Sequence, residues 1–261
     1  MRALNVAATG MMAQQLFLET ISNNIANMTT TGYKRRRPEF QDLLYQSERR
    51  IGAKTSDSGT VVPAGVQIGL GVKPAAVYRL HEQGDLQGTS NPLDIAVQGD
   101  GFFIVDLPDG DLAYTRSGHF QRSNESLLVT ADGYTVSPGI TIPEEAIDIT
   151  INAEGVVEIK LQGEVDTIEV GRLELATFVN PAGLEAVGNN LLLETTASGP
   201  ANIDTPGNEQ TGTLLQGFVE SSNVDPVTEM TMMITAQRAY ELNSKVITAS
   251  DEMMASVTRL R

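Results

Sequence analysis

The first 28 residues carry apolar side chains at alternating spacings of four and three. This spacing places the apolar residues on one face of an amphipathic helix, and only Gln14 interrupts the repeat. We expect the helix to stop where three threonines lead into Gly32, a plausible chain reversal. The residues of this stripe are Leu4, Ala7, Met11, Leu18, Ile21, Ile25 and Met28.

A second helix is predicted at the C-terminal end of the sequence. Asp225 can cap it, Pro226 suits its first position, and neither Gly nor Pro follows through Arg261. Bulky side chains recur every seven residues, and small or polar ones, then a valine, fill the intervening heptad position. The bulky residues are Met233, Tyr240, Ile247 and Met254, and the intervening ones are Ala236, Asn243, Ser250 and Val257.

Each stripe could pack on its own domain or form a coiled-coil seam. Neither helix has a neighbouring helix in the sequence, so each needs a partner from across the chain or from another subunit. We therefore expect the two terminal helices to pair as a coiled coil.

The region between the helices reads as strands and turns. Alternating apolar residues predict half-buried strands around Ile147, Ile149 and Ile151, then around residues 168–175. Short apolar runs predict further strands, and Asp-Gly pairs predict the turns between them. The runs are Phe102–Val105, Leu127–Val129 and Leu191–Leu193, and the pairs are Asp100-Gly101, Asp109-Gly110 and Asp132-Gly133. The fold class is thus α+β, with a mainly antiparallel β body between long terminal helices.

Four segments follow from these patterns. Residues 1–32 would form the N-terminal helix of an inner coiled-coil domain, and 33–75 an extended excursion or long hairpin. Residues 76–215 would form the β-rich body, and 216–261 a return segment with the C-terminal helix. Within the excursion, residues 47–73 are polar and Gly-rich, with little periodicity before Val66.

The charge of the chain is strongly acidic and unevenly distributed. Eighteen Lys and Arg stand against 33 Asp and Glu, a net charge of -15, which argues against nucleic acid as a partner. Residues 1–54 carry +4 and residues 55–261 carry -19. The basic run Lys34-Arg35-Arg36-Arg37 therefore favours contact with an acidic surface of a neighbouring copy over nucleic-acid binding.

Candidate chemistry is sparse. The chain has no Cys and two histidines, His81 and His119, and no Gly-x-Ser-x-Gly motif accompanies either. Asp106–Asp111 lacks the ligand spacing of a calcium loop and reads as a hairpin turn. We expect no catalytic residues, metal or cofactor.

Several stretches together resemble the family of bacterial flagellar rod and hook proteins. Ser22–Asn27 and Thr31–Lys34 resemble the N-terminal signature of that family, and three later stretches extend the similarity over nearly the whole chain. Within the family, the chain length, Asp42–Gln46 and Pro63–Val72 resemble distal rod members, whereas hook subunits usually carry a larger outer insertion. The later stretches are Asn91–Phe103, Tyr114–Phe120 and Gln216–Val224.

This resemblance implies a structural subunit, and not an enzyme, that stacks helically with copies of itself into a hollow rod. The terminal helices would line the tube, and residues 47–73 would stiffen it by contacting adjacent subunits. Implied partners are proximal rod subunits, the hook protein, the peptidoglycan and outer-membrane ring bushing, and the flagellar type III export apparatus. Alternatives are a proximal rod or hook subunit and, from another class, a glycan-active periplasmic enzyme. Expected subunit-interface residues are Leu4, Ala7, Met11, Leu18, Ile21, Ile25, Asn27, Gly32, Tyr33, Lys34, Met233, Tyr240, Ile247 and Met254.

Overall fold

The computed structural model describes residues 2–49, 64–163, 166–208 and 210–259 of the 261. The chain divides into two compact units and passes between them four times. The first unit comprises Met1–Ile25, Arg36–Tyr78 and Asp225–Arg261, and the second comprises Ala26–Arg35 and Arg79–Val224.

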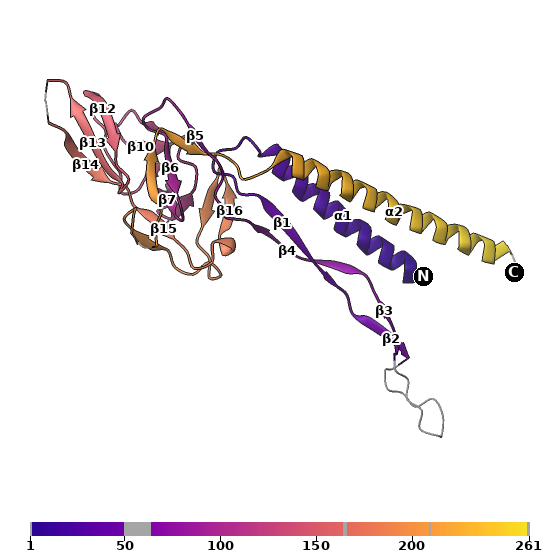
Figure 1. Cartoon of the computed structure of the whole chain (residues 1–261). Coiled ribbons are helices and arrows are strands. Elements are labelled where there is room, and N and C mark those ends of the chain that lie inside the picture. The colour runs from indigo at the N-terminus through magenta and orange to yellow at the C-terminus, as the bar shows by residue number, and fades with distance from the viewer. Residues whose placement is uncertain (1, 50–63, 164–165, 209, 260–261) are drawn as a thin grey trace. The chain divides into compact units, whose positions relative to one another are not determined.

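The first unit consists of two long helices and a two-stranded ribbon (Figure 1). The helices are α1 (Arg2–Ala26) and α2 (Pro226–Arg259). In the ribbon, β1 (Arg36–Asp42) pairs with β4 (Val72–Arg79), and β2 (Tyr45–Arg49) pairs antiparallel with β3 (Val66–Gly69). The expected excursion at residues 47–73 lies largely outside the described residues, because 50–63 are not among them.

Both helices begin and end close to where the sequence predicts. The carboxylate of Asp225 caps α2, since it accepts hydrogen bonds from the backbone N–H groups of Val227 and Thr228, each at 3.2 Å. Pro226 occupies the first helical position, where its missing N–H costs nothing. At the other end of the chain, α1 stops at Ala26 and the backbone turns through Gly32, whose φ is +70°. The predicted fold class, helices at both ends with a mainly antiparallel β body between them, is confirmed.

The second unit is built from antiparallel sheets. Its largest sheet has nine strands, seven of them in the order β16-β17-β8-β7-β11-β10-β9, while β15 also pairs with β7 and β18 pairs with β15. A three-stranded sheet has the order β12-β13-β14, and β6 with β19 and β5 with β20 form separate pairs. A single 3₁₀ turn, η1 (Pro181–Gly183), follows β15. The bounds are β5 Leu86–Gly88, β6 Ile95–Gln98, β7 Phe102–Asp106, β8 Leu112–Thr115, β9 Phe120–Arg122, β10 Leu128–Thr130, β11 Thr135–Val136, β12 Ala146–Ile151, β13 Val156–Leu161, β14 Ile168–Arg172, β15 Leu175–Thr177, β16 Glu185–Gly188, β17 Leu191–Leu193, β18 Asn202–Asp204, β19 Thr213–Gln216 and β20 Phe218–Glu220.

Strand β7 lies at the centre of this unit and is buried on both faces. Phe103 belongs to the main core cluster, whereas Phe102 and Ile104 belong to a second cluster on the opposite face. The alternation follows from the two-residue period of a strand. Burial on both sides explains why the sequence of β7 is a continuous apolar run.

One predicted strand deviates from simple alternation. Ile151 of β12 is buried and Ile149 half-buried, but Ile147 is exposed. The register of β12 on β13 shifts between Ala146 and Asp148, and such a bulge turns the following side chains to the other face. The predicted alternation, which sets Ile147 on the same buried face as Ile149 and Ile151, therefore fails at Ile147.

The Asp-Gly pairs also divide into two kinds. Asp109-Gly110 lies in the turn between β7 and β8, and Asp132-Gly133 lies between β10 and β11, two antiparallel pairs. Asp100-Gly101 instead joins β6 to β7, which are not neighbours in any sheet of the described part of the chain. The predicted turn at Asp100-Gly101 thus separates two strands that do not pair with each other.

Candidate assembly interface

Helices α1 and α2 lie side by side in the first unit and run antiparallel (Figure 1). The side-chain amide of Asn24 donates to a carboxylate oxygen of Glu229 at 3.2 Å. Further along both helices, a Cβ added to Gly10 would lie 3.0 Å from the amide nitrogen of Asn243. Rising residue numbers in α1 therefore correspond to falling numbers in α2.

Asn24 connects three elements of this unit. Besides its bond to Glu229 on α2, its amide donates to the backbone oxygen of Arg36 and accepts from the backbone N–H of Arg36, both at 2.9 Å. Arg36 is the first residue of β1. Because Asn24 and Glu229 are both almost fully buried, these bonds replace water and hold α1, α2 and the ribbon together.

The predicted stripe of α1 is buried to different degrees. Ala7 and Ile21 are buried, whereas Leu4, Met11, Leu18 and Ile25 are half-buried. Met28 lies beyond the end of α1 and is exposed. The stripe is thus only partly covered within one chain.

On α2 the structure differs from the expected seam. Met233 and Ile247 are half-buried, but Tyr240 and Met254 are 40% and 42% exposed. Of the described side chains of α2, Glu229, Ala236 and Ser250 are buried, and the last two are small residues of the intervening heptad position. Small side chains let two helices approach closely, as the tight fit of Gly10 on Asn243 shows. Tyr240 and Met254 thus leave much of their surface uncovered within the single chain, and their packing into a seam stays a prediction.

A second apolar surface runs along α2. We define the outward face of α2 as Val227, Met230, Ile234, Leu242, Val246 and Met253, all of which are exposed. These side chains lie at several heptad positions on both flanks of the α1-facing side, and a free chain would present them to water. Exposed apolar surface of this kind marks an interaction site.

The ribbon fits closely against α1 at Gly71. A Cβ at this position would lie 2.2 Å from the Thr9 hydroxyl oxygen, and the φ of Gly71 is +122°. The backbone N–H of Val72 donates to the same hydroxyl at 3.4 Å. Away from this contact the ribbon exposes apolar side chains, and these are Leu44, Tyr45, Val66, Ile68, Leu70 and Val77.

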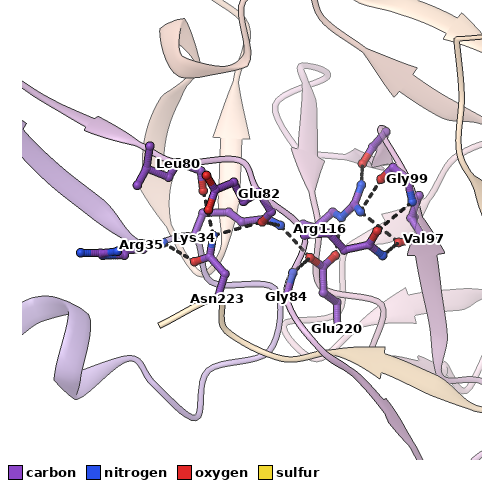
Figure 2. Close-up of polar contacts among 12 residues, drawn as sticks. Lys34, Arg35, Leu80, Glu82, Gly84, Val97, Gly99, Arg116, Glu220 and Asn223 are labelled. Carbon is purple, nitrogen blue, oxygen red and sulfur yellow. Dashed lines mark hydrogen bonds and ion pairs between the residues drawn. The ribbon is translucent and has the colours of Figure 1, made fainter. Parts of the chain in front are cut away.

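In the second unit, Lys34 belongs to a buried cluster of charges (Figure 2). Its ammonium donates to a Glu220 carboxylate oxygen at 2.6 Å and to the backbone oxygen of Glu82 at 2.7 Å. Arg116 donates from Nε to the other carboxylate oxygen of Glu220 at 2.5 Å. The side chains of Lys34 and Glu220 are only 6% and 1% exposed. Lys34 is therefore not part of a basic surface strip, and that expectation was wrong for this residue.

The two cations decide the ionisation of Glu220. Burial by itself would raise the pKa of this carboxyl, but Arg116 and Lys34 outweigh it, so the pKa lies below its ordinary value. For Lys34, burial is the largest influence and lowers the pKa of the ammonium, and Glu220 counters it in part. Glu220 thus acts as the shared anion between two buried cations.

The side chain of Asn223 forms hydrogen bonds with backbone groups of two segments in the same region (Figure 2). Its amide accepts from the backbone N–H of Arg35 at 2.7 Å and donates to the backbone oxygens of Leu80 and Glu82, both at 3.0 Å. Charge and hydropathy patterns in the sequence do not single out Asn223, Glu220 or Arg116. All three lie within the stretches that carry the family resemblance, which was the available signal.

The turn after α1 supports this cluster. The backbone N–H of Gly32 donates to the backbone oxygen of Glu220 at 2.8 Å. Asn27 accepts from the Thr30 hydroxyl at 3.1 Å, and Tyr33, which is half-buried, donates its backbone N–H to the oxygen of Thr30. Gly32, Asn27 and Tyr33 therefore shape the loop that brings Lys34 to Glu220.

The two histidines take structural positions. The Nδ1 atom of His119 lies 2.8 Å from a carboxylate oxygen of Asp94. The backbones of the two residues also form an isolated antiparallel β-bridge. The ring of His81 packs edge-on against the ring of Phe102. Burial, and after it the positive charges of Lys34, Arg79 and Arg116, lower the pKa of His81 to about 4. His81 is accordingly neutral near pH 7.

The described residues offer neither a metal-binding cluster nor a membrane-spanning helix. They contain no group of three or more His, Asp or Glu side chains placed to hold a metal ion. Neither α1 nor α2, over the part the structure describes, is both long and apolar enough to cross a membrane.

Comparison with known proteins matches three parts of the chain to flagellar families. Residues 4–34 match the model of the flagella basal body rod protein, residues 96–159 that of the flagellar hook protein FlgE/F/G D1 domain, and residues 215–260 that of the flagellar basal body rod FlgEFG protein C-terminal region. Lys34 lies in the first of these matches, Arg116 in the second and Glu220 in the third.

Several proteins that are similar over the whole length share the name FlgG. The flagellar basal-body rod protein FlgG of Caulobacter vibrioides is 54% identical over 261 residues, covering all of both chains. FlgG of Agrobacterium fabrum is 49% identical over 99% of each chain, and FlgG of Borreliella burgdorferi is 48% identical over 100% of this chain and 99% of its own. With paired terminal helices, a β body and these full-length similarities, the chain belongs to the family of flagellar basal-body rod and hook proteins.

Proposed function

We propose that this chain is a structural subunit of the flagellar basal body, which polymerises helically into the hollow distal rod. The rod acts as a drive shaft that transmits torque from the motor to the hook through the periplasm and the ring bushing. Membership of the family and full-length similarity to proteins named FlgG support this role. The observation that carries the polymerising part is the outward face of α2.

An isolated subunit leaves that face exposed to water. Leu242 on it is 62% exposed, and its neighbours along the face are exposed as well. Helix α2 also extends beyond the start of α1, so Met253 and Met254 near its end lack cover from α1. Burial of such side chains contributes roughly 1.5–3 kcal/mol each, which favours covering them with helices of other copies. Contacts of this kind that do not close on themselves generate a filament.

The distribution of charge between the two units supports the same arrangement. The first unit carries 11 basic and 10 acidic residues, a net charge of +1, whereas the second carries 7 and 23, a net charge of -16. Copies that met through the second unit would repel one another. Contact through the helices of the first unit avoids this repulsion, so we place the helices inside the tube and the acidic body outside.

The expected interface residues on the two helices fit this proposal in three groups. Leu4, Met11, Leu18 and Ile25 on α1, with Met233 and Ile247 on α2, are half-buried and can be covered further by another copy. Tyr240 and Met254 are exposed and would be covered only in the assembly. Ala7 and Ile21 are already buried within the chain and would act by shaping the surface around them.

The remaining partners follow from membership of the family. We propose contacts with proximal rod subunits at one end of the rod, with the hook protein at the other, and with the peptidoglycan and outer-membrane ring bushing around it. Delivery would use the flagellar type III export apparatus. The exposed apolar side chains of the ribbon, Leu44 and Tyr45 among them, support a role of residues 33–75 in contacts with adjacent subunits.

The proposal is tested by placing a charge on the outward face of α2. Leu242→Asp changes a residue that is exposed in the single chain, so the folding of the chain should be unaffected while rod formation is lost. Thr196→Asp adds the same charge at an exposed polar position of the second unit, away from α2, and should still build rods. Rods are scored in isolated basal bodies after export of each variant has been checked. Normal rods from Leu242→Asp would refute polymerisation through this face.

A further inference from the structure

Two contacts between α1 and α2 show that the helices keep one register along their length. Asn24 bonds Glu229, and Gly10 faces Asn243, and in both pairs the residue numbers add up to 253. The pairs are separated by 14 residues in each helix, which is two heptads. Asn24 and Gly10 therefore share one heptad position of α1, and Glu229 and Asn243 share one heptad position of α2. All four are polar or, in the case of Gly10, unusually small.

The apolar pattern alone cannot specify this alignment. A heptad stripe repeats every seven residues, so sliding one helix by seven again sets apolar positions against apolar positions. Only residues that break the repeat distinguish one register from the next, as a single buried Asn does in coiled coils. Asn24, Glu229, Gly10 and Asn243 are residues of this kind.

Each one-heptad slip places polar groups badly. When the numbers of facing residues add up to 260, Asn24 comes opposite Ala236 and Asn243 opposite Phe17. When they add up to 246, Glu229 comes opposite Phe17. Either slip buries an amide or a carboxylate against a side chain that cannot hydrogen-bond, which is strongly unfavourable.

We propose that the Asn24–Glu229 and Gly10–Asn243 pairs are register keys, which fix the antiparallel alignment of α1 and α2 and thereby decide which apolar faces the subunit offers to other copies. Asn24 can serve as a key because its two bonds to the backbone of Arg36 already fix its amide. Gly10 serves because the space above it admits the side chain of Asn243 and little more. The inference rests on the proposed function only in its consequence for assembly.

The first test reads the register directly. The chain has no Cys, so engineered pairs report unambiguously which residues meet. Gln14→Cys with Ala239→Cys matches the native register, and Gln14→Cys with Val246→Cys matches a slip of one heptad. Each pair is oxidised in rods that contain wild-type and variant subunits together. Bonds within one chain are separated from bonds between chains by mobility in a denaturing, non-reducing gel.

The variant without keys is Glu229→Leu with Asn243→Leu, and its matched control is Glu229→Gln, which keeps an acceptor for Asn24. The control should cross-link at the native pair alone. In the variant without keys, the slipped pair should gain about tenfold or more relative to the native pair, the change that about 1.4 kcal/mol of lost discrimination produces. An unchanged ratio would overturn the proposal.

The second test exchanges the residues of one key and does not depend on that variant. Gly10→Asn alone sets two amides in one space, and Asn243→Gly alone leaves the space empty. The double variant Gly10→Asn with Asn243→Gly restores the pair and keeps one glycine in the seam. We expect both single variants to lose rods and the double variant to regain them with native cross-linking. Normal rods from either single variant, or no recovery in the double, would contradict the role of this pair. Because Leu242→Asp tests the outward face alone, failure of the keys can be told apart from failure of polymerisation.

Discussion

The ammonium of Lys34 lies 2.6 Å from a carboxylate oxygen of Glu220, which is 186 residues away in the sequence. Glu220 also binds Arg116 and the backbone N–H of Gly84, the latter at 2.9 Å. One buried carboxylate therefore joins the segment after α1, strand β20 and the β body of the second unit.

Removing this anion should strongly destabilise the protein. In Glu220→Ala the cations of Lys34 and Arg116 stay buried without a counter-charge, and breaking a buried ion pair from one side costs about 3–5 kcal/mol. Urea unfolding of the full chain measures the change in the free energy of unfolding. Glu82→Gln is the matched control, because the side chain of Glu82 is exposed and only its backbone oxygen takes part. A loss below about 1 kcal/mol in Glu220→Ala would contradict the importance of the cluster.

Acid should weaken the fold through His81. Its folded pKa of about 4 lies below the ordinary 6.5, so the unfolded chain binds a proton in this range while the folded chain does not. Stability from this residue is complete above about pH 6.5 and is lost as the pH falls towards 4. Between pH 7 and pH 5 the expected loss is about 2 kcal/mol. His81→Gln should show a smaller decrease over the same range in thermal unfolding, and an identical decrease would exclude His81 as its source.

Gly32 should be required for stability both because of its positive φ and because a neighbouring backbone lies close to its Cα. Its φ is +70°, and an added Cβ would lie 2.8 Å from the backbone nitrogen of Ser117. Gly133 has a φ of +88° but open space around its Cβ position. Gly133→Ala should cost about 1–2 kcal/mol from backbone strain alone. Gly32→Ala should cost clearly more in the same unfolding experiment, and equal losses would mean that the close approach is relieved cheaply.

Charge and shape should have opposite effects at Ile247 of α2. Ile247→Asp places a carboxylate in a half-buried apolar position, where even a neutral unsatisfied group costs about 1–3 kcal/mol, and should abolish rod assembly. Ile247→Leu keeps volume and apolarity, should cost less than about 1.5 kcal/mol, and should leave working rods. Swimming and rod formation are scored after equal export is confirmed. Normal rods from Ile247→Asp would show that this stripe is no assembly seam.

The sequence is most informative where structure depends on neighbours in the chain. The heptad spacing of Leu4 to Ile25 and the Asp225-Pro226 pair predict both helices, and continuous apolar runs predict strands such as β7. Local patterns do not show which distant residues meet. Lys34 looked like part of a basic surface run because Glu220 and Arg116, its partners, are remote in sequence.

The same limit explains the errors at finer scale. The alternation of Ile147 to Ile151 gave no sign of a bulge, because the bulge depends on the register with β13. On α2 the heptad pattern predicts both seam positions, but not that Ala236 and Ser250 are buried more deeply than Tyr240 and Met254, because that depends on how closely α1 approaches.

The four passages of the chain between its two units set an order for folding. The partners of α1 and of Lys34 lie in α2 and at Glu220, so both units take residues from the last 42 positions of the sequence. A chain that emerges N-terminus first, whether from a ribosome or through a narrow conduit, can complete neither unit until nearly all of it has arrived. Closing such long loops is slow compared with forming local structure. The connectivity itself therefore delays the native state until the end of the chain is free.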